Sequence, residues 1–327
     1  DAKALAMQQG GKVADVWVTS PKPVPTPKMR SQETGALTRS STHAILPSRA
    51  ADNLFWLGRY VERSEQNMRL FRAYFARISD GADHGDRVPA FMRAQLMDNV
   101  GPQAGVIAKR FATPLELGLQ AASRISDRFS PDGMMALRGL VKETQALDRR
   151  AVPVDDIPVE VSRILRQIAG FAGLVHENMY RSDGWRFLSL GVSLERAANM
   201  CAMLAACTSA DAPVGALDLA LEVGDSVGAH HARFLVWANT ASVLEMLAQD
   251  GQNPRAVRYH VSRAKDHIAH LPRQQAGHAL TDVARLVLRV ETRLATSLTP
   301  DITPAFLHEL KQDIWEISDA LNAHHLV

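Results

Sequence analysis

The sequence has little of what a disulfide-stabilised, metal-binding or membrane-spanning protein needs. Among its 327 residues only Cys201 and Cys207 are cysteines, and they point to different sides of one expected helix. The longest uncharged apolar run, residues 168–175, is far too short for a bilayer core about 30 Å thick. We therefore expect reduced thiols, no disulfide, no zinc site and no membrane span, in a cytoplasmic protein.

Net charge is also nearly absent. The 37 basic and 35 acidic residues leave a formal charge of +2, so no large field of one sign is available to attract a polyanion. This balance argues against a dedicated nucleic-acid or anionic-membrane binder, and neither is expected as a partner.

Motifs for nucleotide binding and nucleophilic catalysis are missing as well. The sequence has no Gly-x-x-x-x-Gly-Lys-Ser/Thr loop, no Gly-x-Gly-x-x-Gly and no Gly-x-Ser-x-Gly. Although His260, His267 and His270 share an expected helix, no His-Glu-x-x-His or Cys/His cluster has ligand spacing. We expect Cys201 to be a buried small hydrophobe, and we expect no cofactor and no metal in this chain.

The first 45 residues differ from the rest in composition. Residues 1–20 include the alternating, β-branched run at 13–18, which is typical of a strand and needs partner strands from elsewhere. Residues 21–45 contain four prolines and a Ser/Thr-rich tract, which predict a semi-extended linker.

From residue 46 onward an apolar period of 3.6 residues dominates, and this predicts an all-α domain. Ser48, Asn253 and Thr303 are expected N-caps, the last two each followed by proline at the first helical position. Two long helices, one starting at Ser48 and one after Gly184, carry the clearest core stripes. Further helices are expected at 88–100, 114–130, 132–150, 157–180, 214–228, 232–249, 254–270, 277–297 and 303–323.

The two long helices repeat one pattern at an offset of 133 residues. Leu57-Gly58 aligns with Leu190-Gly191, and Glu62-Arg63 aligns with Glu195-Arg196. The repeat predicts a duplicated helical bundle with two pseudo-symmetric repeats, 46–180 and 181–327, whose motif helices meet near a pseudo-twofold axis. Each glycine, lacking a Cβ, would allow a close backbone approach there.

The repeated charges have two interpretations. In the first, Arg59, Arg63 and Arg196 bind a carboxylate or phosphate, while Glu62 and Glu195 hold an amine or accept a proton. In the second, the same charges form interhelical salt bridges that fix the register of two bundles. The sequence leaves both interpretations open.

Two tryptophans flank the motif starts and are further candidates for substrate binding. Trp56 and Trp185 would wall a pocket in one interpretation and anchor the core in the other, which is the commoner role of aromatics at helix starts.

At these residues the chain resembles the alpha-E domain family, a helical family named for a Glu-Arg motif and typically found as a tandem duplication. The resemblance is carried by the run at 46–63, by 184–197 and by Asn253-Pro254-Arg255, and it covers about 46–327. One departure is that Val192 stands where the first repeat has Arg59, so the resemblance implies an asymmetric site.

Residues 1–20 look like the end of a circularly permuted ATP-grasp domain. The chain begins at Asp1 rather than Met, so we expect a fragment or a processed chain, and the resemblance implies that it is the C-terminal piece of a longer polypeptide. The resemblance implies that ATP and magnesium bind to that upstream or partner module. It further implies a transglutaminase-like peptidase and a proteasome-like hydrolase as partners in a bacterial system that makes or modifies peptides by amide-bond chemistry.

Three functions follow as hypotheses. The leading one is an accessory or substrate-handling domain of ATP-grasp-driven peptide ligation. The second is a non-catalytic scaffold that recruits the ATP-grasp and peptidase partners. The third is an enzyme in its own right that uses Glu62 or Glu195 as a general base, although nearby arginines would lower the pKa that such a base needs.

Overall fold

The computed structural model describes residues 46–79, 86–97, 104–128, 130–149, 152–272 and 280–326, and all regular structure in these ranges is helical. The all-α expectation is confirmed. The expected strand at 13–18 and the linker at 21–45 lie outside the described residues. The long helices are α1 (Ser48–Ser79), α3 (Ala104–Ser123), α4 (Pro131–Arg149), α5 (Ile157–Asn178), α6 (Asp183–Cys207), α10 (Val257–Ala269), α11 (Asp282–Thr296) and α12 (Pro304–Leu321). The short ones are α2 (Val88–Phe91), α7 (Ala216–Val223), α8 (Val227–Arg233) and α9 (Thr240–Leu244).

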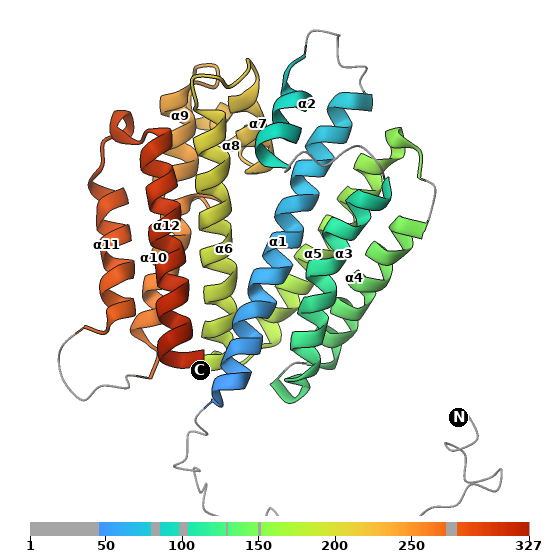
Figure 1. The fold of residues 1–327 in the computed structure, drawn as a ribbon, viewed down its shortest axis with the longest axis vertical. Coiled ribbons are helices and arrows are strands. Elements are labelled where there is room, and N and C mark those ends of the chain that lie inside the picture. The colour runs from blue at the N-terminus through green and yellow to red at the C-terminus, as the bar shows by residue number, and fades with distance from the viewer. Residues whose placement is uncertain are drawn as a thin grey trace, which may run out of the picture. The chain divides into compact units, whose positions relative to one another are not determined.

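The long helices form two sets of four that share one compact unit, residues 46–327 (Figure 1). In one set α1 packs against α3 and α5, and α4 closes the ring; in the other α6 packs against α10 and α12, and α11 closes it. The two sets meet along α1 and α6, which run side by side in the same direction. The motif helices therefore do lie together, while the duplication into pseudo-symmetric repeats stays a prediction.

The two motif helices touch through their glycines. A Cβ built on Gly58 would lie 2.2 Å from the carbonyl oxygen of Leu188, and one on Gly191 would lie 2.1 Å from that of Phe55. Only glycine permits this approach, so the expected role of the two glycines is confirmed. The crossing fixes the height at which residues four positions further along each helix face one another.

Both predicted core stripes are buried. Along α1 the buried residues recur at steps of three and four, as they do along α6. The stripes consist of Leu54, Leu57, Val61, Ser64, Met68, Phe71 and Phe75 on α1, and Phe187, Leu190, Leu194, Ala197, Cys201 and Leu204 on α6.

Of the three predicted N-caps, one is confirmed and two are wrong. Thr303 caps α12 and its side chain accepts a hydrogen bond from the amide of Phe306, as expected. Ser48 is already the first residue of α1 rather than its cap. Asn253 does not cap α10, which begins at Val257, because its side-chain oxygen accepts from the amide of Arg255 in an Asx turn instead.

Several helix boundaries were also wrong. The helix expected at 214–228 is split between α7, which ends at Val223, and α8, which begins at Val227. The helix expected at 114–130 begins at Ala104, with Pro114 inside it; the carbonyl of Arg110, which loses its helical donor there, is approached by the side-chain amide of Asn67 at 3.5 Å. The helix expected at 232–249 is interrupted after Arg233, because a capping box at Asn239 starts a new helix, α9.

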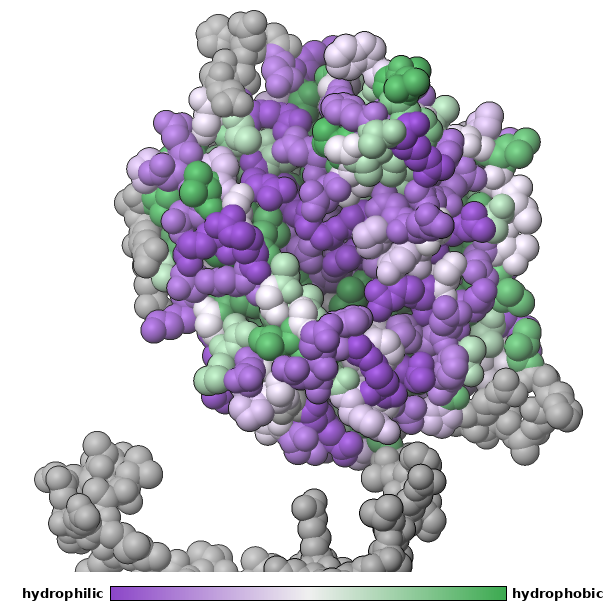
Figure 2. All heavy atoms as spheres, turned by 180° about the vertical axis from the view of Figure 1, so that it is seen from behind, coloured by the Kyte–Doolittle hydropathy of each residue, from purple (hydrophilic) through white to green (hydrophobic). Residues whose placement is uncertain are grey.

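The face of the molecule seen in Figure 2 is mostly hydrophilic, with apolar residues scattered between polar ones. Within the described ranges, no helix combines the length and the apolar character that a membrane span requires.

Candidate functional site

The charged motif residues meet at the contact between α1 and α6, but they form two clusters rather than one. Each glutamate reaches across to an arginine of the other helix, so that Glu62 pairs with Arg196 and Glu195 pairs with Arg63. The exchange of partners follows from the glycine crossing, which places both Glu-Arg pairs at matching heights. One cluster lies against α10 and the segment between α7 and α8, and the other lies against α12.

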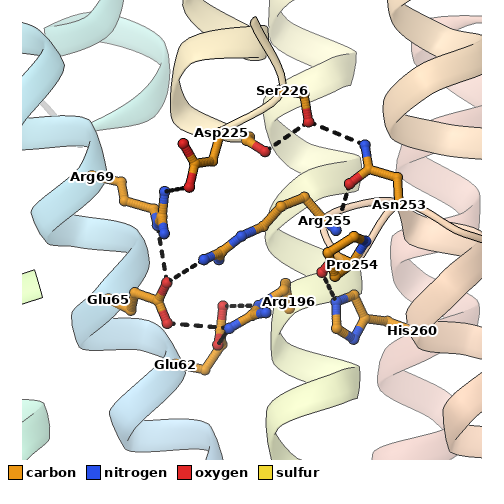
Figure 3. A network of polar contacts seen from close by, with 11 residues as sticks. Glu62, Glu65, Arg69, Arg196, Asp225, Ser226, Asn253, Pro254, Arg255 and His260 are labelled. Carbon is orange, nitrogen blue, oxygen red and sulfur yellow. Dashed lines mark hydrogen bonds and ion pairs between the residues drawn. The ribbon is translucent and has the colours of Figure 1, made fainter. Parts of the chain in front are cut away.

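The first, here called the Glu62 cluster, comprises Glu62, Glu65, Arg69, Arg196 and Arg255 (Figure 3). Arg196 donates to Glu62 through Nε at 2.6 Å and also through Nη2, which is the bidentate geometry of a strong ion pair. The same Nη2 donates to Glu65 at 3.1 Å. Glu65 additionally accepts from Arg255 at 2.7 Å and from Arg69 at 3.0 Å.

The pKa values of the two carboxylates in this cluster are shifted in opposite directions. Burial raises the pKa of Glu62 above its usual value, against the lowering effect of Arg196, and the neighbouring charge of Glu65 raises it further. Burial acts on Glu65 too, but Arg196, Arg255 and Arg69 outweigh it and lower its pKa to about 2. Glu65 is thus the permanent anion of the cluster.

Arg255 enters the Glu62 cluster from the turn that precedes α10. Asn253 shapes this turn, since its amide nitrogen donates to the carbonyl of Met246 at 3.0 Å and to the hydroxyl of Ser226 at 3.1 Å. His260 supports the turn by pairing Nε2 with the carbonyl of Pro254 at 2.8 Å. Burial and the charge of Arg196 lower the pKa of His260 well below its usual value, so this imidazole is neutral.

The second, here called the Glu195 cluster, comprises Glu195, Arg59, Arg63 and Ser318. Glu195 accepts from Nε of Arg59 and from Nε of Arg63, both at 2.8 Å, and from Nη2 of Arg63 at 3.2 Å. Arg59 is buried and also donates to the hydroxyl of Ser318 at 3.2 Å. By contrast, 39% of the Arg63 side chain is exposed.

The two candidate tryptophans lie in different surroundings. Trp56 stacks under the Arg59 guanidinium at 4.8 Å, and Trp315 approaches the same group at 4.4 Å. Trp185 lies against the ring of His267 at 4.9 Å, and lines a cavity of about 200 Å³ together with Gly58 and Arg196, among others. Trp56 therefore holds a motif arginine, whereas Trp185 borders the outer side of the helix crossing.

Sequence reasoning missed three members of the Glu62 cluster. Glu65 lies three residues after Glu62 and Arg69 four residues after Glu65, so helical spacing alone would have placed both on the motif face. Arg255 belongs to the Asn-Pro-Arg segment, whose sequence gives no indication that it contacts α1. The substitution of Val192 for a second Arg59 has the expected consequence, because Glu195 receives two arginines from α1 while Glu62 receives one from α6.

A cavity of about 680 Å³ adjoins the Glu195 cluster and is lined from α1, α3, α6, α12 and the π-helical segment Met92–Leu96. Arg63 and Glu195 both border it. The Glu195 cluster therefore has an open side, which is a feature that the sequence did not reveal.

In the described ranges no three His, Cys, Asp or Glu side chains are arranged to hold a metal ion. Both cysteines are buried, and burial raises the pKa of each thiol to about 12. Neither thiol is therefore ionised at neutral pH.

Comparison with known proteins assigns the architecture. Residues 46–326 match the Alpha-E family, described as "a predicted alpha-helical domain with a conserved ER motif". The chain belongs to the Alpha-E family. The ER motif of this description is present twice on the α1–α6 contact, as Glu62-Arg63 and Glu195-Arg196.

The relatives are long proteins. Over 330 aligned residues this Alpha-E chain is 25% identical to the uncharacterized protein Mb2597 of Mycobacterium bovis and 24% identical to the uncharacterized protein Rv2567 of Mycobacterium tuberculosis. Each match covers 88% of this chain but only 37% of the relative, so the chain spans little more than a third of their length. No solved structure matches the chain.

Proposed function

We propose that this Alpha-E domain is a non-catalytic accessory domain of an ATP-dependent system that forms amide bonds in peptides. The observation that carries the proposal is the reciprocal pairing of the motif: Arg196 holds Glu62, while Arg59 and Arg63 hold Glu195. Every charged motif side chain has a partner on the opposite helix. This pairing favours a structural role for the motif and leaves substrate handling to the surfaces beside it.

The pairing also weighs against a general base in the motif. A general base needs a carboxylate that a substrate proton can reach, with a pKa near the working pH. Glu62 has a raised pKa, but only 2% of the residue is exposed and both carboxylate oxygens accept from Arg196. Glu195 is equally buried. We therefore assign Arg59 and Arg196 to positioning, rather than to binding of an acyl-phosphate, whereas Arg63 pairs with Glu195 and also has a side chain that is 39% exposed.

The partners in this proposal are those that the resemblance of residues 1–20 implies. A circularly permuted ATP-grasp module would bind ATP and magnesium, and a transglutaminase-like peptidase and a proteasome-like hydrolase would act in the same system. The length of the mycobacterial relatives supports additional modules, since 63% of each lies outside the match.

One observation favours a scaffold that recruits the ATP-grasp module. In the segment between α8 and α9, Leu235 is fully exposed and Trp237 is 91% exposed, which is unusual for large apolar side chains. We expect Trp237→Ser to weaken binding of that module in a pull-down at an unchanged melting temperature. Leu298→Ser, at an exposed leucine of another loop, is the matched control.

The accessory role is tested by following ATP-dependent amide formation by mass spectrometry, using the ATP-grasp module with and without this chain. We expect product to require the chain. We also expect the double variant Glu62→Gln, Glu195→Gln to form product in proportion to its folded fraction, at a lower melting temperature. Loss of product from a folded double variant would show that the glutamates take part in the reaction. Equal product without the chain would exclude the accessory role.

A further inference from the structure

The cavity beside the Glu195 cluster carries an excess of positive charge. Its volume of about 680 Å³ is in the range of small-molecule sites. Arg63, Arg110 and Lys311 enter it from three different helices, α1, α3 and α12. Glu195 is the single carboxylate among its described lining residues, and two arginines already share that charge. An anionic ligand would therefore be attracted to this cavity.

Two of the cations have hydrogen-bonding capacity to spare. Arg63 donates to Glu195 through Nε and Nη2, so Nη1 keeps its hydrogens for a ligand. Lys311 is half-buried, and its ammonium group makes no hydrogen bond or ion pair with the described part of the chain. An ammonium group that borders a cavity and has no acceptor from the protein is available to a ligand oxygen.

The remaining polar lining consists largely of primary amides. Gln66 and Asn199 face the cavity from α1 and α6, Gln95 borders it from the π-helical segment, and none of the three pairs with another described group. A primary amide both donates and accepts, as a peptide bond does, so it matches a ligand with amide groups better than a bare inorganic anion. Leu70 and Met203 add apolar surface.

We propose that this cavity binds a peptide-like ligand with a free carboxylate, which Arg63 and Lys311 hold while Asn199 and its neighbouring amides contact the peptide groups. The Arg63 guanidinium, fixed on one edge by Glu195, presents its other edge in the geometry that a carboxylate prefers. The assignment deepens the proposed function, because it gives the accessory domain a substrate class, but binding itself requires no partner protein.

The test is isothermal titration calorimetry of this chain with the tripeptide Ala-Ala-Glu at low ionic strength. We expect saturable binding that weakens at least tenfold for Ala-Ala-Gln-amide, a tripeptide without any carboxylate, and also weakens as salt is added. Lys311→Gln should raise the Kd about tenfold without lowering the melting temperature, because Lys311 has no described partner to lose. Lys142→Gln removes the same charge from the exposed side of α4 and should leave Kd unchanged.

Asn199→Asp gives an independent test, since it keeps the side-chain size and adds a negative charge to the cavity. It should also weaken Ala-Ala-Glu about tenfold. Failure of wild type to bind the tripeptide, or equal binding by Lys311→Gln, overturns the proposal. Binding of inorganic phosphate without the tripeptide would show a phosphate site instead. Because no ATP-grasp module is present, these outcomes are separate from the test of the accessory role.

Discussion

The Glu62 cluster and the Glu195 cluster use the same two residue types on the same two helices, yet they differ in what encloses them. Around Glu62 the excess arginine charge is directed inward, to Glu65, and then to Asp225, whose carboxylate lies 3.7 Å from Arg69. Around Glu195 the excess stays on Arg63, which faces a cavity. The difference indicates that the arginines of the Glu62 cluster are largely neutralised by neighbouring carboxylates, whereas the Glu195 cluster keeps one arginine, Arg63, beside an open cavity.

The comparison also shows how a repeated motif becomes asymmetric without losing its ion pairs. The first repeat has Arg59 where the second has Val192. Glu195 therefore pairs with the buried Arg59 as well as with Arg63, so the charge of Arg63 is less needed to neutralise it. The first glutamate instead shares Arg196 with Glu65, which obtains two further arginines. Each carboxylate is satisfied, and Arg63 borders the larger cavity of about 680 Å³ while Arg196 borders the smaller one of about 200 Å³.

The largest expected effect separates the two clusters directly. Arg196→Gln leaves the buried Glu62 carboxylate without its ion-pair partner and should cost about 4 kcal/mol in the free energy of unfolding. Arg63→Gln leaves Glu195 paired with Arg59 and should cost about 1 kcal/mol, because Arg63 is exposed to solvent. Urea denaturation at pH 7 measures both. Equal losses would contradict the distinction between a closed and an open cluster.

A second prediction concerns the glycine contacts between α1 and α6, which position both clusters. Gly191→Ala forces a methyl group onto the carbonyl of Phe55, and Gly58→Ala does the same at Leu188, so either variant must separate α1 from α6. Overpacking of this kind should cost about 3 kcal/mol. Thermal unfolding followed by circular dichroism measures the loss.

Gly139→Ala is the matched control for the glycine variants. Gly139 lies inside α4, and a Cβ added there would meet no atom within 4 Å, so alanine should stabilise the protein by about 0.5 kcal/mol. A similar response of Gly139→Ala and Gly191→Ala would mean that the glycine crossing does not hold the helices together.

Much of this fold could be predicted because its information is local. The 3.6-residue period identified both core stripes, and the glycine four residues before each glutamate indicated a close backbone approach. The failures occurred where a side chain had a non-local alternative. Asn253 ties its turn to Ser226 and Met246 instead of capping a helix, and Pro114 lies within a helix whose freed carbonyl meets Asn67.

The sequence predicted the motif residues of the candidate site but not their pairing, and it missed Glu65, Arg69 and Arg255. All five charged motif residues lie at the α1–α6 contact, as the repeat indicated, but periodicity does not say which glutamate meets which arginine. Nor could it show that Arg255, distant in sequence, would bind Glu65, or that Lys311 would enter a cavity beside Arg63. These relations depend on how helices are placed in space, and helix amphipathicity leaves that placement open.

The pH dependence of stability should distinguish the two carboxylates of the Glu62 cluster. Glu65 has a pKa of about 2 in the folded protein and 4.5 ordinarily, so its stabilisation is present above pH 4.5 and is lost as the pH falls toward 2, by about 3 kcal/mol in total. Glu62 has a raised pKa, so its contribution has the opposite sign: it is present below pH 4.5 and is lost as the pH rises through the folded-state pKa.

Melting temperatures between pH 2 and 6 test this assignment. Glu65→Gln should reduce the fall in melting temperature with decreasing pH below pH 4.5, here called the acid limb. Glu177→Gln, at an exposed glutamate of α5, should leave the shape of the acid limb unchanged. His267, whose pKa burial lowers to about 4, destabilises the protein from about pH 6.5 downward in every variant, so the difference between variants isolates Glu65. An unchanged acid limb in Glu65→Gln would show that its three arginines do not stabilise the folded state.

The smallest expected effect concerns the buried edge of the Glu195 cluster. Ser318→Ala removes the hydroxyl that accepts from Nη1 of Arg59 and should cost about 1 kcal/mol, because Arg59 keeps Glu195 and the faces of Trp56 and Trp315. Ser123→Ala, at an exposed serine of α3, should be neutral in the same urea titration. If the Ser318→Ala loss persists in the background of Arg63→Gln, then Arg59 anchors Glu195 without help from Arg63. The open arginine is then available to a ligand at little cost to the fold.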